Sequence, residues 1–295
     1  MKRRNFLLYS SLFLASCSVA RTSASDGEDL DRETLRLAVS DVRGEEELER
    51  DYGSFRAALA SVLDTKVEFV PVENTFDAVA ALELDRVDLV WAGPSEYITI
   101  NARTNAMPLV GISRPTTRAI VATRADRGIS SLTDLKGKAI EMGKVGLTNN
   151  HLLPIKLLLE AGLDPTTDVR ILHSPNYDFK ALDSGEADAW ARASHRYELA
   201  LQEQGASAKD YPIIAEYAPI PHDTIVVSNY IEPDRIERMR ADLLENAKPI
   251  AASIAQSETL GSKFSGSELV AVGDTDYNVI REVYRAIGKD ELVEE

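Results

Sequence analysis

The sequence predicts an α/β fold in which largely parallel sheets are covered by helices on both faces. Short apolar stretches typical of strands alternate with longer segments whose apolar residues recur at helical spacing. About 260 residues carry this pattern, which exceeds one typical domain, so we expect two lobes. No long segment rich in Pro, Gly or Ser interrupts the pattern, and the lobes must therefore be joined by short crossings.

The first half of the chain alternates strands and helices. The helix expected over residues 45–63 places Leu48, Tyr52, Phe55 and Leu59 on one face, as in a helix that packs on a sheet. Runs rich in Val, Ile and Leu indicate buried strands. Strands are expected at 35–39, 66–72, 87–91, 109–112 and 119–123, and helices at 45–63, 76–84 and 95–100.

The second half of the chain repeats this order. Strands are expected at 138–142, 169–172, 187–190 and 225–228, and helices at 154–160, 178–182, 196–204, 233–254 and 276–287. The short segments 124–131 and 217–223 are the predicted crossings between lobes. We therefore assign residues 34–124 and 224–295 to one lobe and residues 125–223 to the other.

The N-terminus has the pattern of a bacterial export signal. Basic residues precede an apolar run at 6–15, which is far shorter than the ~20 residues needed to span a bilayer. The run ends in Leu-Ala-Ser before Cys17, the arrangement of a lipoprotein cleavage site. We expect residues 1–16 to be removed as a signal peptide, Cys17 to carry the lipid, and the polar residues 17–33 to form a tether.

The charge of the chain limits its partners. The signal peptide holds Lys2, Arg3 and Arg4 and no acidic residue, so the mature chain keeps 30 basic and 48 acidic side chains, a net charge of −18. Such a chain is not expected to bind nucleic acid, which needs a basic surface. An anion site must then be built locally, from backbone N–H groups and hydroxyls. The run at 3–7, RRNFL, resembles the twin-arginine motif, so both export routes stay open.

A polar turn at residues 147–151 lies between a predicted strand and a predicted helix. Thr148, Asn149 and Asn150 are helix-capping residue types, because their side-chain oxygens accept hydrogen bonds from the first free N–H groups of a helix. Those N–H groups and the positive end of the helix dipole also attract anions. A plain helix cap and a ligand-binding loop both fit this pattern.

The sequence lacks the common motifs of catalysis and metal binding. There is no G-x-S-x-G, P-loop, G-x-G-x-x-G or cysteine nucleophile, and the single cysteine excludes a disulfide framework. The four histidines lack the spacing of metal ligands. We therefore expect no catalytic residues, no metal and no cofactor.

Four motifs, in order along the chain, resemble those of a known family. Residues 87–97 read VDLVWAGPSEY, residues 131–138 read SLTDLKGK, residues 184–189 read SGEADA and residues 220–223 read IPHD. Together they resemble the periplasmic substrate-binding proteins of phosphate, phosphite and phosphonate ABC transporters. The resemblance covers about residues 35–287. It implies a two-lobe type II periplasmic-binding-protein fold, with mixed sheets flanked by helices and a ligand cleft between the lobes.

The resemblance also implies a function. The chain is expected to be the lipid-anchored substrate-binding component of an ABC importer for a phosphorus oxyanion, working with permease and ATPase subunits at the periplasmic face of the bacterial cell membrane. The lipid anchor is its only expected membrane attachment. Two alternatives stay open: a binding protein for a different small metabolite, and a two-lobe sensor domain, because fold does not dictate function.

By this resemblance, the turn at 147–151 is the ligand loop. The family pattern there is Ser-Thr-Ser-Gly followed by an aromatic residue. Thr148 is kept, Leu147 loses a hydroxyl donor, Asn149 still offers an NH₂ donor, and Asn150 replaces the glycine. We therefore expect the loop geometry to persist and the ligand contacts to change.

Further ligand-binding residues carry over one by one. Thr75 and Thr116 lie where the family places aromatic donors, and Tyr97 is either a ligand contact or a residue packed beneath the cleft. His195 lies where aminophosphonate binders place a carboxylate for the amine, and Asp223 matches a carboxylate that binds ligand. One family contact is expected to be lost, because Pro175 lies where some members have a ligand-binding histidine.

Overall fold

The computed structural model describes residues 34–294, apart from 41, 43 and 262. The expected signal peptide at 1–16, the tether at 17–33 and Cys17 lie outside the described residues. Within the described part of the chain, no helix combines the length and the apolar character needed to cross a membrane.

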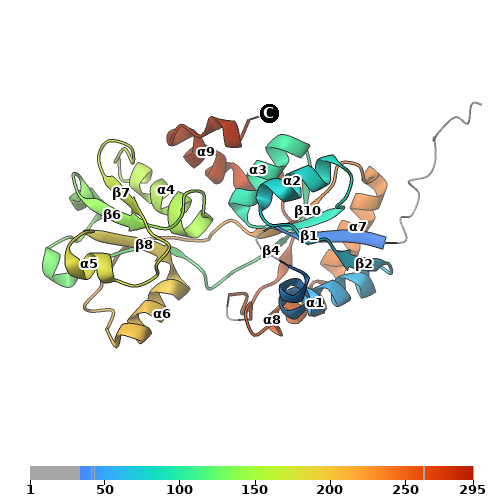
Figure 1. The fold of residues 1–295 in the computed structure, drawn as a ribbon, viewed down its shortest axis with the longest axis horizontal. Helices are drawn as coiled ribbons and strands as arrows, with labels where there is room; N and C mark the ends of the chain where they lie inside the picture. The colour runs from blue at the N-terminus through green and yellow to red at the C-terminus, as the bar shows by residue number, and fades with distance from the viewer. Residues whose placement is uncertain (1–33, 41, 43, 262, 295) are drawn as a thin grey trace, which may run out of the picture. The chain divides into compact units, whose positions relative to one another are not determined.

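Six strands of the described chain form the first sheet, in the order β11-β4-β10-β3-β1-β2 (Figure 1). These strands are β1 (Thr34–Val39), β2 (Lys66–Phe69), β3 (Leu89–Ala92), β4 (Met107–Ile112), β10 (Asp223–Val227) and β11 (Leu269–Val270). Strand β1 is parallel to β2 and β3, whereas β10 is antiparallel to β3 and β4. The sheet is therefore mixed.

Helices pack on both faces of this sheet because its side chains alternate between them. In β1, Leu37 belongs to the core beneath α1 (Glu45–Val62), α7 (Pro233–Glu245) and α8 (Ala247–Ala255), while Ala38 belongs to the core beneath α2 (Thr75–Glu83) and α3 (Pro94–Thr104). On the first of these faces, Trp91 packs edge-on against Tyr52 and Phe264, with ring centroids 5.1 and 5.4 Å apart.

Five strands of the described chain form the second sheet, in the order β7-β6-β8-β5-β9. They are β5 (Ala119–Thr123), β6 (Ala139–Met142), β7 (Arg170–His173), β8 (Ala189–Ala193) and β9 (Ile213–Tyr217), and the helices of this lobe are α4 (Leu153–Glu160), α5 (Lys180–Ser184) and α6 (Ser194–Gln204). Phe179 stacks on Tyr211 and meets Trp190 edge-on at the centre of an aromatic core.

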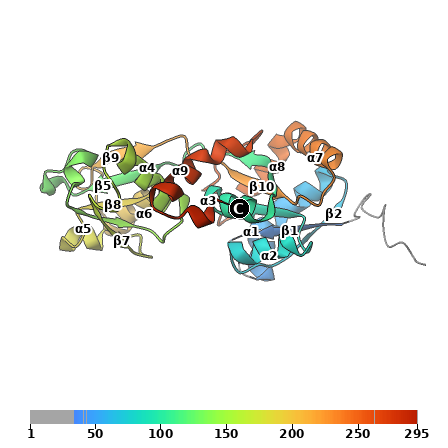
Figure 2. The ribbon, with the colours of Figure 1, turned by 90° about the horizontal axis from the view of Figure 1, so that it is seen from above.

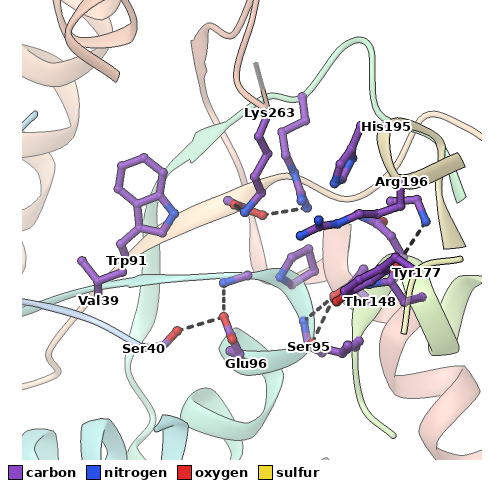
Figure 3. Close-up of a pocket in the computed structure, with 18 of the residues that line it drawn as sticks. Val39, Ser40, Trp91, Ser95, Glu96, Thr148, Tyr177, His195, Arg196 and Lys263 are labelled. Atoms are coloured by element: carbon purple, nitrogen blue, oxygen red, sulfur yellow. Dashed lines mark hydrogen bonds and ion pairs between the residues drawn. The ribbon is translucent and has the colours of Figure 1, made fainter. Parts of the chain in front are cut away.

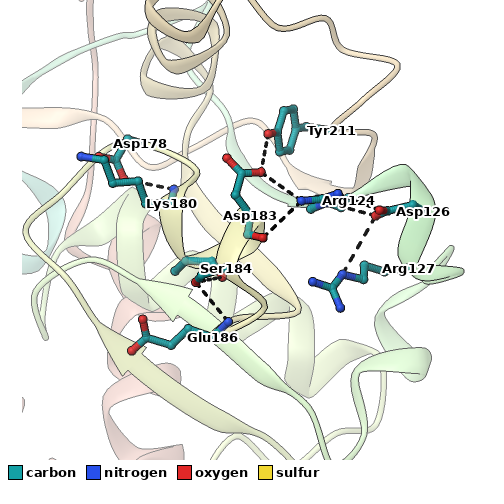
Figure 4. Close-up of polar contacts among 10 residues, drawn as sticks. Arg124, Asp126, Arg127, Asp178, Lys180, Asp183, Ser184, Glu186 and Tyr211 are labelled. Carbon is teal, nitrogen blue, oxygen red and sulfur yellow. Dashed lines mark hydrogen bonds and ion pairs between the residues drawn. The ribbon is translucent and has the colours of Figure 1, made fainter.

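The chain crosses between the sheets at residues 113–118 and 218–222. We had predicted the crossings at residues 124–131 and 217–223. Strand β5 pairs with β8 and β9, so it belongs to the second lobe. The predicted boundary between residues 124 and 125 had placed this strand in the first lobe. Arg124, at the end of β5, is tied into the second lobe by ion pairs with Asp126 at 2.7 Å and Asp183 at 3.4 Å (Figure 4). Arg124 therefore packs with the second lobe in this structure.

The C-terminal helix α9 (Asn278–Ala286) lies beside both α3 and α4 (Figures 1 and 2). Its apolar residues Ile280, Val283 and Tyr284 are buried, and Lys156 of α4 forms an ion pair with Glu282 at 3.0 Å. Helix α9 thus contacts elements of both lobes, although we had assigned residues 224–295 to the first lobe alone. A second difference is that the helix expected over 233–254 breaks at Asn246 into α7 and α8.

Candidate ligand-binding site

A cavity of about 280 Å³ is lined by residues from both lobes (Figure 3). The first lobe and the crossings contribute Val39, Ser40, Tyr52, Trp91, Gly93, Pro94, Ser95, Glu96, Arg114, Asp223 and Lys263, and the second lobe contributes Leu147, Thr148, Asn149, Asn150, Tyr177, Ala193, His195 and Arg196. The lining is polar where the lobes meet. In Figure 3, Trp91 and Val39 lie on the opposite side from Arg196 and Tyr177.

Three helix N-termini reach the cavity. Helix α3 begins after Gly93, the π-helical turn η3 (Thr148–Leu152) begins after Leu147 and runs into α4, and α6 begins after Ala193. None of these three preceding residues has a polar side chain that could cap the first amides. The positive ends of the helix dipoles therefore act together on the cavity and favour a negatively charged ligand.

Cationic side chains add to this potential. Among the described residues that line the cavity, Arg114, Arg196 and Lys263 are basic, whereas only Glu96 and Asp223 are carboxylates. The charge of the lining is thus positive in a chain whose overall charge is strongly negative. We had expected an anion site made of backbone N–H groups and hydroxyls alone, and that expectation missed these three side chains.

Arg114 and Asp223 form a buried ion pair, with 2.7 Å between Nη2 and Oδ1. Each residue is less than a tenth exposed, and Lys263 Nζ lies 3.8 Å from Asp223 Oδ2. Arg114 Nε is buried without a hydrogen-bond partner in the described part of the chain. A buried guanidinium N–H without an acceptor costs free energy, so a ligand oxygen that accepts from it is stabilised.

Glu96 fixes the first turn of α3. Its Oε2 accepts hydrogen bonds from Ser40 Oγ at 2.9 Å and from the Gly93 backbone N–H (Figure 3). This carboxylate therefore ties the end of β1 to the start of α3. It also lies near the positive end of the α3 dipole, where a carboxylate is stabilised.

The residues of the polar turn connect the helix starts to one another. Thr148 Oγ1 accepts from the Ser95 N–H at 3.2 Å and donates to Ser95 Oγ at 3.1 Å, so it joins η3 to α3 (Figure 3). Asn150 Oδ1 accepts from the Ala193 N–H at 2.9 Å and joins η3 to the start of α6. The turn is π-helical, a geometry that often occurs at functional sites.

Asn149 differs from its neighbours in this turn. It lines the cavity, it is only 7% exposed, and its Oδ1 atom is buried without a hydrogen-bond partner in the described chain. The oxygen and nitrogen of an amide are assigned from their partners, and here no partner decides between them. If the positions of the amide oxygen and nitrogen are exchanged, the NH₂ group can donate to an oxygen of an anionic ligand.

His195 is a neutral side chain at neutral pH. His195 lines the cavity, where the surrounding protein displaces part of the water around its ring. This desolvation, and then the charges of Arg196, Lys263 and Arg114, lower the pKa of His195 to about 4. A neutral imidazole can donate one hydrogen bond to a ligand, but it does not replace a carboxylate as the partner of an amine.

The cavity brings together most of the predicted site residues. Thr148, Asn149, Asn150, His195 and Asp223 line it. Of the described residues that we had expected at the ligand, Thr75, Tyr97 and Thr116 are not part of the lining.

Each of these three residues has another position in the structure. Tyr97 is buried, donates to Asp274 at 2.6 Å and packs on Tyr277, so it lies beneath the cleft. Thr75 is the first residue of α2, and the Thr116 carbonyl accepts from Ser194 Oγ at 3.4 Å.

Arg114, Arg196, Lys263 and Tyr177 were missed from the sequence. Arg114 lies in the displaced crossing and Tyr177 in the loop after β7, and neither belongs to a recognisable motif. Only the position of Arg196, at the start of a predicted helix, could have indicated a role near a helix N-terminus.

Comparison with known proteins identifies the class. Residues 37–277 match the family described as "ABC transporter, phosphonate, periplasmic substrate-binding protein", and this chain belongs to that family. The family resemblance inferred from the four motifs is thereby confirmed. Family members are substrate-binding proteins, which agrees with the expectation of a binding protein and not an enzyme.

Individual relatives are more distant. The phosphate-import protein PhnD of Mycolicibacterium smegmatis is 26% identical over 199 residues, which cover 59% of this chain and 62% of that protein, less than two thirds of its length. Among solved structures, PhnD1 of Prochlorococcus marinus in complex with methylphosphonate superposes with a TM-score of 0.62, at 18% identity over 87% of this chain and 99% of that one. A Xanthomonas citri protein bound to ATP reaches a TM-score of 0.67, at 17% identity over 89% and 100% of the two chains. These likenesses confirm the two-lobe periplasmic-binding-protein fold.

Proposed function

We propose that this protein binds a phosphorus oxyanion, namely a phosphonate, phosphate or phosphite, in the cavity between its lobes and delivers it to the permease and ATPase subunits of an ABC importer. The observation that carries the proposal is the convergence of three helix N-termini and three basic side chains on one cavity. The unpartnered groups of Arg114 and Asn149 are the contacts that a ligand oxygen would complete. Family membership supports the transport role.

Asp223 supports a phosphorus oxyanion over sulfate. An ionised carboxylate can only accept hydrogen bonds, so it favours a ligand oxygen that carries a proton. Phosphonates, phosphate and phosphite keep such a proton near neutral pH, as phosphate monoesters do below a second pKa of ~6. Sulfate has no proton to donate. Because Arg114 and Lys263 partly neutralise Asp223, we expect this discrimination to come mainly from the missing hydrogen bond.

The position of His195 argues against a preference for aminophosphonates. The family carboxylate that pairs with the amine is replaced here by an imidazole whose pKa is lowered to about 4. Two cations, Arg196 and Lys263, also face the same space and would repel an ammonium group. The preferred ligand therefore has an anionic head and no amine near it.

The test is calorimetry with methylphosphonate, phosphite, phosphate, 2-aminoethylphosphonate and sulfate. We expect one of the first three to bind most tightly, and Asn149→Ala to weaken it by at least roughly ten-fold, because a hydrogen bond to a charged group contributes about 1.5–3 kcal/mol. Asn246→Ala is the matched control, since the Asn246 side chain donates to the Asp242 carbonyl at the end of α7 and does not line the cavity. Tighter binding of sulfate or of 2-aminoethylphosphonate would contradict the proposal. Failure of all five ligands would favour a different metabolite or a sensor role.

We also propose that the protein is exported and held at the periplasmic face of the bacterial cell membrane by a lipid on Cys17. The support is the sequence Leu-Ala-Ser-Cys at the end of a short apolar run, together with membership of a periplasmic family. A lipid anchor would keep the binding protein close to its permease, which raises the effective concentration of one partner for the other.

A further inference from the structure

Tyr177 and Arg196 form a cation–π pair at the edge of the cavity. The guanidinium carbon of Arg196 lies 4.2 Å from the centroid of the Tyr177 ring, and both side chains line the cavity (Figure 3). They come from different elements: Tyr177 from the loop after β7, and Arg196 from the first turn of α6. The pair therefore joins a loop and a helix N-terminus of the second lobe at the ligand site.

Arg196 differs from the other basic residues of the cavity in its surroundings. Arg114 and Lys263 both face Asp223, at 2.7 and 3.8 Å. In the part of the chain that the structure describes, no carboxylate lies within ion-pair distance of Arg196. Among the three basic side chains of the cavity, Arg196 is thus the one whose charge the protein neutralises least. Its planar guanidinium carries N–H donors that can bind two oxygens of one anion.

The loop that carries Tyr177 is held from inside the lobe. Arg192 is fully buried, and its Nη2 donates to the carbonyl oxygens of Ser174 at 3.3 Å and Asn176 at 3.0 Å. The same nitrogen forms an ion pair with Glu141 at 3.1 Å. The guanidinium of Arg192 also lies 5.8 Å from the Tyr177 ring. These contacts fix the position of an aromatic ring that would otherwise stand on an unsupported loop.

We propose that Tyr177 is a positioning residue for ligand binding, which orients the Arg196 guanidinium so that it donates to two oxygens of a tetrahedral oxyanion. A ring centroid 4.2 Å from the guanidinium carbon limits the freedom of the Arg196 side chain before the ligand arrives, so less side-chain entropy is lost on binding. The same loop contains Pro175, where some family members have a ligand-binding histidine. Through Arg196, Tyr177 gives this loop an indirect contact with the ligand. This inference rests on the proposed function.

The test compares Tyr177→Phe, which keeps the aromatic face, with Tyr177→Leu, which removes it. Calorimetry uses whichever of methylphosphonate, phosphite, phosphate and sulfate the wild type binds most tightly. We expect Tyr177→Phe to bind within about two-fold of wild type and Tyr177→Leu to bind about five-fold more weakly, the size of one partly exposed cation–π contact. The midpoint of thermal unfolding without ligand should stay nearly constant, because the Tyr177 side chain is half-buried on a surface loop.

A double mutant separates positioning from a general structural effect. In an Arg196→Gln background, Tyr177→Leu should cause no further loss of affinity, because no guanidinium remains to be oriented. Unchanged affinity of the single Tyr177→Leu variant, or an equal loss in both backgrounds, would refute the positioning role while the proposed function stands. If the wild type binds none of the four anions, both the proposed function and this inference fail.

Discussion

The loop of the candidate site should make the stability of the protein sensitive to mild acid, through His151. This residue lies directly after Asn150, is 3% exposed, and its Nδ1 accepts a hydrogen bond from the Gly146 N–H at 3.3 Å. Burial, and to a smaller extent the neighbouring His173, lower the pKa of His151 to about 4 from its ordinary 6.5. The folded state therefore binds fewer protons than the unfolded state, and stability is lost as the pH falls from about 6.5 towards about 4.

The size of this effect follows from the two pKa values. With 6.5 for the unfolded and about 4 for the folded protein, the free energy of unfolding should fall by about 2 kcal/mol between about pH 7 and about pH 5 through His151 alone. The pKa values of His195 and His222 are lowered as well, so the wild type should lose more than this. The measurement is urea unfolding at both pH values, followed by the fluorescence of the buried Trp91 and Trp190.

Two variants isolate the contribution of His151. In His151→Asn, the amide oxygen can accept the Gly146 N–H but the side chain does not titrate, so about 2 kcal/mol of the pH-dependent loss should disappear, whatever the absolute stability of the variant. His173→Asn, in which the buried His151 remains, should keep the loss. The reasoning is refuted if His151→Asn loses as much stability as the wild type between the two pH values.

Four further predictions concern packing, charge, processing and motion. A Cβ atom at Gly111 would lie 2.5 Å from Val272 Cγ1, so Gly111→Ala should lower the free energy of unfolding by about 1–3 kcal/mol. At Gly273 a Cβ would make an ordinary contact, 3.9 Å from Thr275 Oγ1, so Gly273→Ala should cost less than about 1 kcal/mol in the same urea experiment. Arg192→Leu should destabilise the fold by about 3–5 kcal/mol because it leaves Glu141 charged and buried, and a second change, Glu141→Leu, should restore part of that loss. Mass spectrometry of the membrane fraction should find a diacylglyceryl group on Cys17, and a mature chain that keeps an unmodified Cys17 would contradict the lipid anchor. Small-angle scattering should show a smaller radius of gyration at saturating ligand if the lobes close about the two crossings, and an unchanged radius would count against hinge closure.

The alternation of apolar runs was sufficient to predict most strands and helices, because local spacing decides whether a segment can bury one face. It did not decide which sheet a strand joins. Strands β4 and β5 are both largely apolar and only six residues separate them, so nothing in the two strands indicates that the chain changes sheet between Ile112 and Ala119. The short β9 and β11 were missed because β9 is only half-buried and β11 has two residues.

The site was predictable where capping chemistry and family motifs coincided. Thr148, Asn149 and Asn150 combine both signals, and all three line the cavity. The basic residues could not be found in this way, since a single arginine or lysine in a loop has the same sequence appearance at a site and on a solvated surface. Only the fold brings Arg114 and Lys263, nearly 150 positions apart in sequence, to the same carboxylate.

The ion pair between Arg114 and Asp223 also couples the binding site to the connections between the lobes. Arg114 lies in the first crossing, and Asp223 directly follows the second, so the pair links the two segments about which the lobes would rotate. A ligand oxygen that accepts from Arg114 Nε would share the charge of this guanidinium with Asp223, which pairs with its Nη2. A substitution that alters the Arg114–Asp223 ion pair should therefore change the affinity for the ligand. By thermodynamic reciprocity, ligand binding must change the stability of this ion pair by the same factor. Occupancy of the cavity would in this way be converted into lobe orientation, the quantity that a transporter can sense from outside.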